Sequence, residues 1–372
     1  MKRLLHVQLL PILSGVQQVS LRIFENLDRT EYEPWLLCAP STADCPNLVS
    51  EARKLGVQVH MLSGLARRPG IADAAVLVNM VRFMRKHRFD IVHTHSSKTG
   101  FLGRIAARLA GVPCVVHTVH GIPFHRCVPA PLRLLYWLAE AAVGPCTDRL
   151  VLVNRYYQRY YTFVSAARRT TIYNAIDYDA VQPRRPRDDG LVRVLWANRF
   201  EPQKDPLNFM LAAHMAVKRL PALRVTMAGD GPLLRQAERY VARHGLQDRI
   251  ALPGWSDDIA SLMCAHDIFC TSSRWEAFGL VHLEAAAAGA PVVATAVEGV
   301  PEVVMHEQTG LLTPPEDPEA MAAAIVRLAE DADLRKRLGE NGALCAPREF
   351  PLDKFIEGYH SIYKSCNGRP HA

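Results

Sequence analysis

The sequence predicts an α/β protein of two domains, each built on a parallel β-sheet covered by α-helices. Short apolar runs alternate with amphipathic helical stretches along the chain, which is the pattern of strands joined by crossover helices. The length of 372 residues is more than one hydrophobic core usually supports. A polar, proline-rich segment near the middle, after which the alternation starts again, divides the chain into two parts.

Residues 1–182 are assigned to the first domain. Its expected strands are short apolar runs that should be buried on both faces. They are Leu4–Leu9, Trp35–Ala39, Val57–Leu62, Ile91–His95, Cys114–Thr118 and Leu150–Val153. The basic and apolar start of the chain also has features of a secretory signal. His6, Gln8 and Pro11 interrupt its apolar run, so a buried first strand is the better interpretation.

Residues 183–190 are the expected linker, because they are polar, rich in proline and prone to turns. The second domain follows at residues 191–350, and residues 351–372 carry a last amphipathic helix. The expected strands of this half are Val192–Ala197, Leu223–Ala228, Ile250–Pro253, Asp267–Thr271 and Pro291–Thr295, and its expected helices include Pro318–Asp331, Asp333–Leu344 and Leu352–Ser365.

The composition is that of an ordinary globular protein, with 49% hydrophobic and 22% charged residues. Nine cysteines without a C-x-x-C motif are expected to be reduced, buried thiols of a cytosolic chain, and they show no zinc-site spacing. No apolar run reaches the roughly 18 residues that a transmembrane helix needs. We therefore expect a cytoplasmic protein, whose membrane contact, if it has one, is peripheral on the inner face of the cytoplasmic membrane.

The net charge of +7 is unevenly distributed along the chain. Residues 1–186 hold 24 Lys and Arg against 12 Asp and Glu, a balance of +12, whereas the other 20 basic and 25 acidic residues balance to −5. A basic first half indicates an anionic partner. Nucleic acid is not expected, because the basic residues are scattered and no nucleic-acid-binding motif accompanies them. An anionic membrane surface or a lipid phosphate fits, and a basic surface without a partner is the alternative.

Two glutamates flank a step from loop to helix in the stretch R-W-E-A-F-G-L-V-H-L-E-A-A-A-A-G-A-P-V-V-A-T, Arg274–Thr295. On one continuous helix Glu276 and Glu284 would lie about 80° apart, so we place Glu276 in the loop and Glu284 in the first helical turns. Between them, the backbone N–H groups of residues 277–280 and the helix dipole form an anion site, which Gly279 allows a phosphate to approach. Such a site suits a nucleotide-sugar. The alternative is a solvated glutamate pair on a surface helix.

The stretch E-A-F-G-L-V-H-L-E-A-A-A-A-G-A-P-V-V-A-T closely resembles the E-x7-E segment of the family 4 retaining glycosyltransferases. The resemblance implies the GT-B architecture, in which two Rossmann-like domains with parallel sheets face each other across a cleft. It also implies that the last helix crosses back to the first domain. The match covers nearly the whole chain and is strongest from Arg199 to Leu312. Within it, Glu298–Glu302 and Thr309–Leu312 are similar to the family's G-x-P-E and G-x-L segments.

The resemblance further implies which residues bind the donor. The loop N-R-F-E-P-Q-K, Asn198–Lys204, resembles the family pattern G-R-[LF]-x-x-x-K-[GD], with Asn198 in place of the usual glycine. The Arg and Lys of that pattern hold the leaving diphosphate, and two cations on one loop can neutralise its charge. Expected donor-binding residues are Gly15, Arg199, Lys204, Ser256, Glu276, Phe278, Gly279, Leu280 and Glu284, with Glu284 on the ribose, Glu276 on the sugar hydroxyls and Ser256 in the nucleobase segment.

Histidines follow two neighbouring strands in segments that resemble the family's D-I-V-H-x-H and T-x-H-G. The alternation of a strand points His93 and His95 to the same side of the sheet. His120 comes just beyond its strand and before a glycine, so it is best placed to reach a cleft. His120 and Glu276 are therefore the expected catalytic residues. A metal site is not expected, because no carboxylate stands at helical spacing to these histidines.

Two segments of the first half are candidates for a membrane-facing surface. The stretch Pro123–Gly144 combines apolar and aromatic residues with Arg126 and Arg133, and it is expected to form a mobile acceptor loop followed by an amphipathic helix. The helix Ile71–His87 adds further basic residues, namely Arg82, Arg85 and Lys86. Core packing explains the Leu and Trp residues of the first stretch equally well.

The resemblance implies a retaining hexosyl- or N-acetylhexosaminyltransferase. It would transfer a sugar from a nucleotide-sugar, with a UDP-sugar favoured, to a lipid-linked glycan in cell-surface polysaccharide assembly. Retention would follow from front-face attack in which the leaving phosphate helps to deprotonate the acceptor. No cofactor or metal is expected, because protein cations meet the charge of the diphosphate. Two alternatives stay open: a sugar-nucleotide 2-epimerase, which would need additional acid/base carboxylates, and a catalytically inactive sugar-nucleotide-binding protein.

Overall fold

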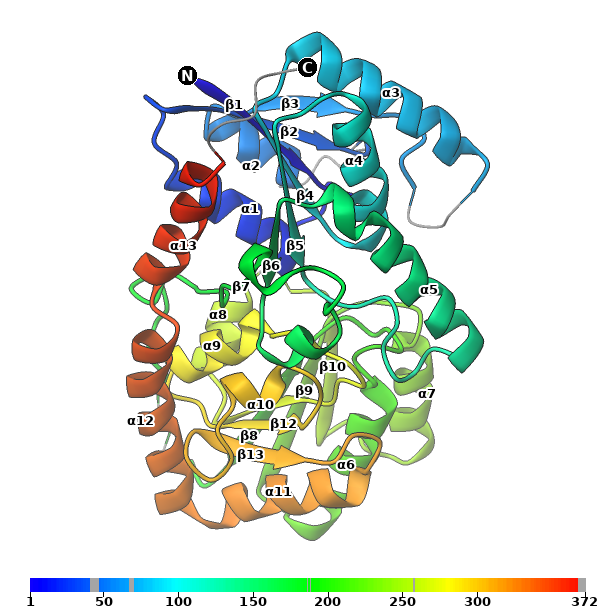
Figure 1. Ribbon diagram of the computed structural model, residues 1–372. Helices are drawn as coiled ribbons and strands as arrows, with labels where there is room; N and C mark the ends of the chain where they lie inside the picture. Colours follow the sequence, from blue (N-terminus) through cyan, green and yellow to red (C-terminus); the bar gives the residue numbers. More distant parts are fainter. Residues whose placement is uncertain (41–46, 67–69, 186, 188, 257, 367–372) are drawn as a thin grey trace. The chain divides into compact units, whose positions relative to one another are not determined.

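The computed structural model describes residues 1–40, 47–66, 70–185, 187, 189–256 and 258–366. The chain divides into two compact units (Figure 1): Met1–Asn174 with Asp353–Ala372 form the first, and Ala175–Leu352 form the second. Each unit is built on one parallel β-sheet that is packed between helices. The expected α/β class, with two parallel-sheet domains, is therefore confirmed.

The division at Asn174 puts the expected linker, residues 183–190, inside the second unit. Local bonding is the reason. The backbone N–H of Arg184 donates to the Ala288 carbonyl at 2.7 Å, and the Arg184 guanidinium pairs with Asp267 at 2.7 Å. Residues 186 and 188 of this segment lie outside the described residues.

A seven-stranded parallel sheet forms the centre of the first unit, in the order β3-β2-β1-β4-β5-β6-β7. Its strands are β1 (Lys2–Val7), β2 (Tyr32–Cys38), β3 (Gln58–Met61), β4 (Ile91–His95), β5 (Cys114–Val119), β6 (Arg149–Leu152) and β7 (Arg169–Thr171). The first six overlap the six apolar runs that were expected to be strands. The sequence did not indicate β7, because R-T-T has no apolar residue and its strand character comes from pairing with β6.

Helices cover both faces of this sheet, and the side chains of each strand point to them alternately. These helices are α1 (Gly15–Glu25), α2 (Leu48–Lys54), α3 (Ala72–His87), α4 (Ser97–Leu109), α5 (Ala130–Val143) and α13 (Leu352–Lys364). Leu5 and Val7 of β1 pack in one core with α3 and α4, whereas His6 between them faces the opposite way and contacts Tyr363 of α13. No helix in the described part of the chain is long and apolar enough to cross a membrane.

The second unit has a six-stranded parallel sheet in the order β10-β9-β8-β11-β12-β13. Its strands are β8 (Val192–Ala197), β9 (Leu223–Ala228), β10 (Ile250–Gly254), β11 (Ile268–Thr271), β12 (Val292–Thr295) and β13 (Gly310–Thr313). Its helices are α6 (Pro206–Arg219), α7 (Leu234–Arg243), α8 (Ile259–Cys264), α9 (Leu280–Ala287), α10 (Val300–Val303), α11 (Pro318–Glu330) and α12 (Ala332–Glu349). Val194 and Trp196 pack with α6, whereas Leu195 and Ala197 face the core that contains α9.

The strand order indicates where a ligand can bind in the second sheet. β8 and β11 are neighbours, and the connection after β8 leads to β9 on one side, whereas the connection after β11 leads to β12 on the other side. In open parallel sheets the loops that follow the two strands of such a switch point leave a crevice at their carboxyl ends. The loops after β8 and β11 are the ones that carry Arg199, Lys204 and Glu276.

The expectation that all the cysteines are reduced and buried is wrong for this structure. Cys114, at the start of β5, forms a disulfide with Cys366, which follows α13. Their sequence separation of 252 gave no sign of the pair, but α13 covers the face of β5 to which Cys114 points, and the Cα atoms come within 5.6 Å. Of the described free cysteines, Cys38, Cys264 and Cys270 are buried, whereas Cys127, Cys146 and Cys345 are partly exposed. Cys45 lies outside the described residues.

A buried ion pair attaches α5 to α4. Arg104 of α4 is 0% exposed, and its Nη2 donates to the two carboxylate oxygens of Glu140 in α5 at 2.5 and 2.9 Å. Its Nε donates to the Gly100 carbonyl at 2.8 Å. A buried charge is tolerated only while such partners remain in place.

We expect Glu140→Gln to lower the free energy of unfolding of the first unit by about 3 kcal/mol, because it leaves the Arg104 charge buried without its carboxylate. Adding Arg104→Met should recover part of this loss. The control is Glu307→Gln, which breaks an exposed pair with Arg327 and should change the stability by less than about 0.5 kcal/mol. Chemical denaturation followed by circular dichroism measures all three variants. Equal midpoints for Glu140→Gln and the control would contradict the assignment.

Candidate functional site

Hydrogen bonds hold the loop after β8 against the loop after β11. The indole N–H of Trp196 donates to Ser272 Oγ at 3.0 Å. Ser272 Oγ in turn donates to the Lys204 carbonyl at 2.7 Å. Gln203 Nε2 also donates to the Trp275 carbonyl at 3.1 Å. The side chains of the two loops are therefore presented together at the switch point of the sheet.

Lys204 and Glu276 form an ion pair between these loops, from Nζ to Oε2. Ser273 Oγ donates to the same carboxylate oxygen at 3.3 Å. The side chains of Lys204 and Glu276 are only 14% and 13% exposed. Burial acts to raise the pKa of Glu276, but the Lys204 charge and hydrogen bond outweigh it and the pKa is lowered. Glu276 is therefore a carboxylate at neutral pH.

Arg199 lies on the same loop as Lys204, and its Nη1 pairs with Glu201 at 2.9 Å. Its side chain is 37% exposed, so a ligand can reach the guanidinium. The turn after β9 packs closely against this loop. Gly229 has φ +139°, and a Cβ there would come within 1.9 Å of the Asn198 carbonyl oxygen, so only glycine allows this approach.

The first turn of α9 begins at Leu280, directly after Gly279. Gly279 has φ +79°, and a Cβ on it would lie 2.6 Å from the His282 ring. The first N–H groups of a helix have no partner within the helix, so this terminus attracts anions. Phe278 and Leu280 are buried, and Glu284 within α9 is partly exposed. The expected placement of Glu276 in the loop and Glu284 in the helix is therefore correct.

His282 supports this turn, and reasoning from the sequence did not single it out. Its Nδ1–H donates to the Phe278 carbonyl at 3.2 Å, which makes Nε2 the acceptor for the Thr271 hydroxyl at 2.9 Å. Burial lowers the pKa of His282 to about 4, so the ring is neutral at pH 7. The available signal was its place in the first turn of α9, four residues after Phe278.

Ser256 is not joined to this ion pair by any contact in the structure that we describe. It follows β10, the edge strand, which β9 separates from β8. Its Oγ accepts a hydrogen bond from the Asp258 N–H at 3.3 Å. Asp258 in turn caps α8 by accepting from the Ser261 N–H at 2.9 Å. Because all strands of this sheet run parallel, Ser256 and the ion pair both lie at the edge of the sheet where the strands have their carboxyl ends.

Gly15 and His120 belong to the first unit. Gly15 is the first residue of α1 and is exposed. His120 follows β5, and its Nε2 lies 2.9 Å from His95 Nδ1. His117 faces the other side of the sheet, where its Nδ1 lies 2.9 Å from Thr94 Oγ1.

His6, His93 and His95 have ring nitrogens within 4.8 Å of one another, which is the spacing of a possible metal site. The expectation did not include His6, which reaches the group because β1 pairs with β4 and His6 is in register with His93. Their ring nitrogens already have hydrogen-bond partners, for example Tyr363 Oη and Thr118 Oγ1 on His93, both at 2.7 Å. A metal ion could bind here only if such bonds were given up.

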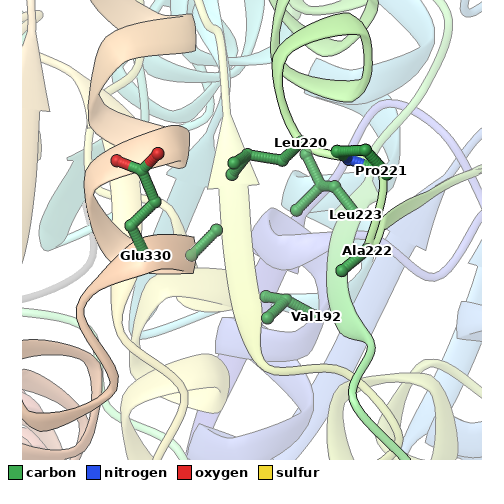
Figure 2. Close-up of a pocket in the computed structure, with 7 residues that line it drawn as sticks. Val192, Leu220, Pro221, Ala222, Leu223 and Glu330 are labelled. Atoms are coloured by element: carbon green, nitrogen blue, oxygen red, sulfur yellow. The ribbon is translucent and has the colours of Figure 1, made fainter.

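An apolar hollow lies elsewhere on the second unit (Figure 2). It is lined by Val192, Leu220, Pro221, Ala222, Leu223, Ala329 and Glu330. Val192 and Leu223 are the first residues of β8 and β9, so this hollow lies at the amino end of the strands. It is therefore at the opposite edge of the sheet from Lys204 and Glu276, and it offers one carboxylate and no cation to an anionic ligand.

Residues 178–344 of the chain match the family described as glycosyl transferases group 1, and residues 14–175 match the glycosyl transferase 4-like domain. The chain is 34% identical over 346 residues to the UDP-Gal:alpha-D-GlcNAc-diphosphoundecaprenol alpha-1,3-galactosyltransferase of Escherichia coli, a match that covers 88% of each protein. It is 26% identical over 304 residues to the N-acetyl-alpha-D-glucosaminyl L-malate synthase of Bacillus anthracis, with 78% of each protein covered.

Solved structures show the same fold. The Anabaena protein HepE in complex with UDP-glucose aligns with a TM-score of 0.82 at 19% identity, covering 98% of this chain and all of that one. A sucrose-phosphate synthase from Thermosynechococcus elongatus aligns with a TM-score of 0.82 at 21% identity, covering 98% of this chain and 99% of that one. The two parallel-sheet domains therefore have the GT-B architecture.

Two glycines at the ends of α9 allow a direct test of whether the His282 ring restricts the residue at position 279. Gly279 and Gly289 have similar left-handed φ angles of +79° and +76°, but a Cβ on Gly289 meets nothing within 4 Å. We expect Gly289→Ala to cost about 1–2 kcal/mol of stability from backbone strain alone. Gly279→Ala should cost clearly more, because the His282 ring must move as well. Denaturation midpoints measure both variants. An equal loss in both would show that the ring does not confine Gly279.

Proposed function

This chain belongs to the group 1 glycosyl transferases and uses a nucleotide-sugar donor, and from this premise we propose that it transfers a hexose from a UDP-sugar to a lipid-linked glycan with retention of configuration. The relative from Escherichia coli supports both substrates, because its name gives UDP-Gal as donor and a sugar on diphosphoundecaprenol as acceptor. An identity of 34% over 88% of both proteins makes this pair of substrates the first choice to test.

The observation that carries the donor proposal is the Lys204–Glu276 pair in front of α9. A lysine ammonium has three N–H donors, so Lys204 can hold Glu276 and a phosphate oxygen at the same time. Arg199 brings a second cation from the same loop, and the amides at Phe278–Leu280 supply backbone donors. Together they would stabilise the charge that develops on a leaving diphosphate. Since protein groups meet this charge, we propose that the reaction needs no metal.

In this proposal, the two glutamates bind different parts of the donor. Glu276 lies in the loop beside the ion pair, where its carboxylate can accept hydrogen bonds from hydroxyls of the transferred sugar. Glu284 lies one helical turn beyond Leu280 and can accept two bonds from ribose hydroxyls. We assign Ser256 to the nucleobase, and Gly15 and His120 of the first unit to the phosphates and the reacting sugar.

A lipid-linked acceptor requires the enzyme to work at a membrane, and α5 has a surface suited to this. Its exposed leucines are Leu132 (38%), Leu134 (56%), Leu135 (58%) and Leu138 (50%). Arg133 on α5 and Arg126, four residues before this helix, are also exposed. Leucines beside cations are the pattern of a helix that lies in the membrane interface. In the first unit α3, α4 and α5 follow one another on the same face of the sheet (Figure 1), and α3 adds the exposed Arg82, Arg85 and Lys86.

Release of nucleoside diphosphate tests the proposed function. The full chain is incubated with UDP-, GDP- and ADP-sugars, with and without an N-acetylglucosaminyl diphospholipid. We expect acceptor-dependent release of UDP, unaffected by EDTA, and a product whose anomeric configuration matches that of the donor. Lys204→Ala should lower the rate by about 10²-fold, whereas Lys218→Ala, an exposed lysine at the far end of α6, should not. Epimerised donor without release, or no turnover of any donor, would contradict the proposal.

The proposed roles of the glutamates predict different kinetic effects. Ribose binding by Glu284 is present in both the ground state and the transition state, so Glu284→Gln should mainly raise the donor KM. Orientation of the reacting sugar by Glu276 matters most in the transition state, so Glu276→Gln should mainly lower kcat. Steady-state kinetics separate the two effects. The reverse pattern would show that the two roles are exchanged.

Leucine variants of α5 test whether this helix binds the membrane. We expect the protein to sediment with vesicles that contain anionic phospholipid and to be released as the salt concentration rises. Leu134→Gln with Leu135→Gln should weaken this binding at least tenfold, since each removes about 1.5–3 kcal/mol of apolar burial. Leu344→Gln, in α12 and 73% exposed, is the control and should have no effect. Equal binding to neutral vesicles, or equal loss in the control, would contradict α5 as the contact.

A further inference from the structure

A chain of hydrogen bonds leads from His120 into the interior of the first unit. His120 Nε2 lies 2.9 Å from His95 Nδ1, and His95 Nε2 lies 3.1 Å from His6 Nδ1. The Ser20 hydroxyl lies beside this second contact, 3.0 Å from His6 Nδ1 and 3.4 Å from His95 Nε2. The three histidines come from β1, β4 and the end of β5, which are neighbours in the sheet.

The chain continues through the hydroxyl of Tyr363 in α13. This oxygen lies 3.0 Å from His6 Nε2 and 2.7 Å from His93 Nδ1. His93 Nε2 then lies 2.7 Å from Thr118 Oγ1, which is 3.3 Å from the hydroxyl of Tyr359. His6, His93 and His95 are 0% exposed, whereas His120 is partly exposed. His120 is thus the one member of the four-histidine chain that a ligand can reach.

All four rings are neutral near pH 7. Burial lowers the pKa of His6 and of His120 to about 3, and it lowers the pKa of His93 and of His95 well below the ordinary value. A neutral imidazole carries one N–H and one bare nitrogen. Each contact between two ring nitrogens therefore needs the proton on one side only.

Two proton arrangements satisfy every contact in this network and also give the Tyr363 hydroxyl proton an acceptor. If His6 Nδ1 carries the proton, it donates to His95 Nε2, and His95 Nδ1–H then donates to His120 Nε2. His6 Nε2 is then bare and accepts from Tyr363, whose oxygen accepts from His93 Nδ1–H. In this arrangement all four histidines are protonated on Nδ1. Reversing every bond gives the second arrangement, in which all four are protonated on Nε2.

The groups beside the chain can serve either arrangement. Ser20 Oγ accepts from Gln8 Nε2 at 2.7 Å, which leaves its own proton for whichever neighbouring ring nitrogen is bare. Thr118 donates to His93 in one arrangement and accepts from it in the other. A mixed arrangement would bring two N–H groups or two lone pairs together in a buried place, or would leave the Tyr363 hydroxyl proton without an acceptor in these contacts, and either change loses a hydrogen bond.

We propose that His95, His6 and Tyr363 are positioning residues for His120: they hold its ring through Nε2 and determine whether its outer nitrogen, Nδ1, offers a proton or a lone pair to a sugar hydroxyl. A hydroxyl can accept or donate, so it can bind in either arrangement. His120 then acts as a neutral hydrogen-bonding group and not as a base that takes up a proton. The choice of a sugar hydroxyl as ligand rests on the proposed function, but the coupling of the four rings does not.

Histidine tautomers, measured by 15N NMR on the full chain labelled at histidine, test this coupling without any assay of activity. Protonated and bare ring nitrogens have widely different 15N shifts. We expect His6, His93, His95 and His120 at pH 7 to carry their proton on the same ring nitrogen, all on Nδ1 or all on Nε2. A mixture of tautomers among the four in the unmodified protein would overturn the proposal.

Tyr363→Phe breaks the chain at its centre. The variant leaves His6 Nε2 and His93 Nδ1 without a partner, and a buried lone pair without a partner costs less than a buried N–H. We therefore expect the proton of His6 on Nδ1 and that of His93 on Nε2. His95 and His120 should follow His6, so that the variant has a mixed set.

Tyr32→Phe is the matched control. Its hydroxyl is buried, has no hydrogen-bond partner among the described residues, and belongs to a ring 6.1 Å from the Tyr363 ring. The four tautomers should not change in this variant. If the unmodified protein carries the four protons on Nε2, His120 changes its tautomer in Tyr363→Phe, and we expect kcat for UDP release to fall up to about tenfold, the value of one hydrogen bond. If it carries them on Nδ1, only His93 changes and kcat should stay constant, as it should in Tyr32→Phe in either case. Unchanged tautomers in a folded Tyr363→Phe protein would overturn the coupling, and a changed His120 tautomer with unchanged kcat would overturn its role in turnover.

These outcomes are separate from the fate of the proposed function. If the unmodified protein releases no nucleoside diphosphate from any donor, the proposed function fails, while the tautomers still decide whether the four rings are coupled. If Tyr363→Phe does not fold, the shared tautomer in the unmodified protein remains the deciding measurement.

Discussion

The Lys204–Glu276 ion pair is the interaction on which the candidate site of the second unit depends. It joins the loop after β8 to the loop after β11, and it keeps a nearly buried carboxylate charged in front of the first turn of α9. Without the cation, burial would favour the protonated acid, and the loop would lose its attachment. The ammonium of Lys204 has further N–H donors that can bind a phosphate. One pair therefore supports both the local structure and the proposed chemistry.

Much of the fold could be predicted from the sequence, because a parallel sheet buried on both faces needs short apolar strands. Val192–Ala197 and Ile91–His95 have the predicted bounds for this reason. The placement of Glu276 in a loop and Glu284 in a helix also followed from helical geometry alone. The polar strand β7 could not be found in this way, because it owes its structure to pairing with β6.

Contacts between distant parts of the chain could not be predicted from the sequence, because they depend on how the helices and strands pack. Cys114 and Cys366 meet only because α13 packs on the face of β5, and the register of β1 with β4 is what brings His6 beside His93. Neither of these two contacts can be recognised from one sequence. The histidine pattern at the ends of β4 and β5 pointed to His120, but its coupling to Tyr363 depends on both the sheet and the last helix. His282 was missed because its role is to support the turn at Gly279.

A structure of the protein with a non-transferable UDP-sugar bound is the most direct test of the central claim. We expect a diphosphate within hydrogen-bond distance of Lys204 Nζ and the first amides of α9, with ribose at Glu284 and the sugar at Glu276. A nucleotide bound anywhere else, for example at the apolar hollow beside Val192, or a diphosphate that does not contact Lys204, would contradict it.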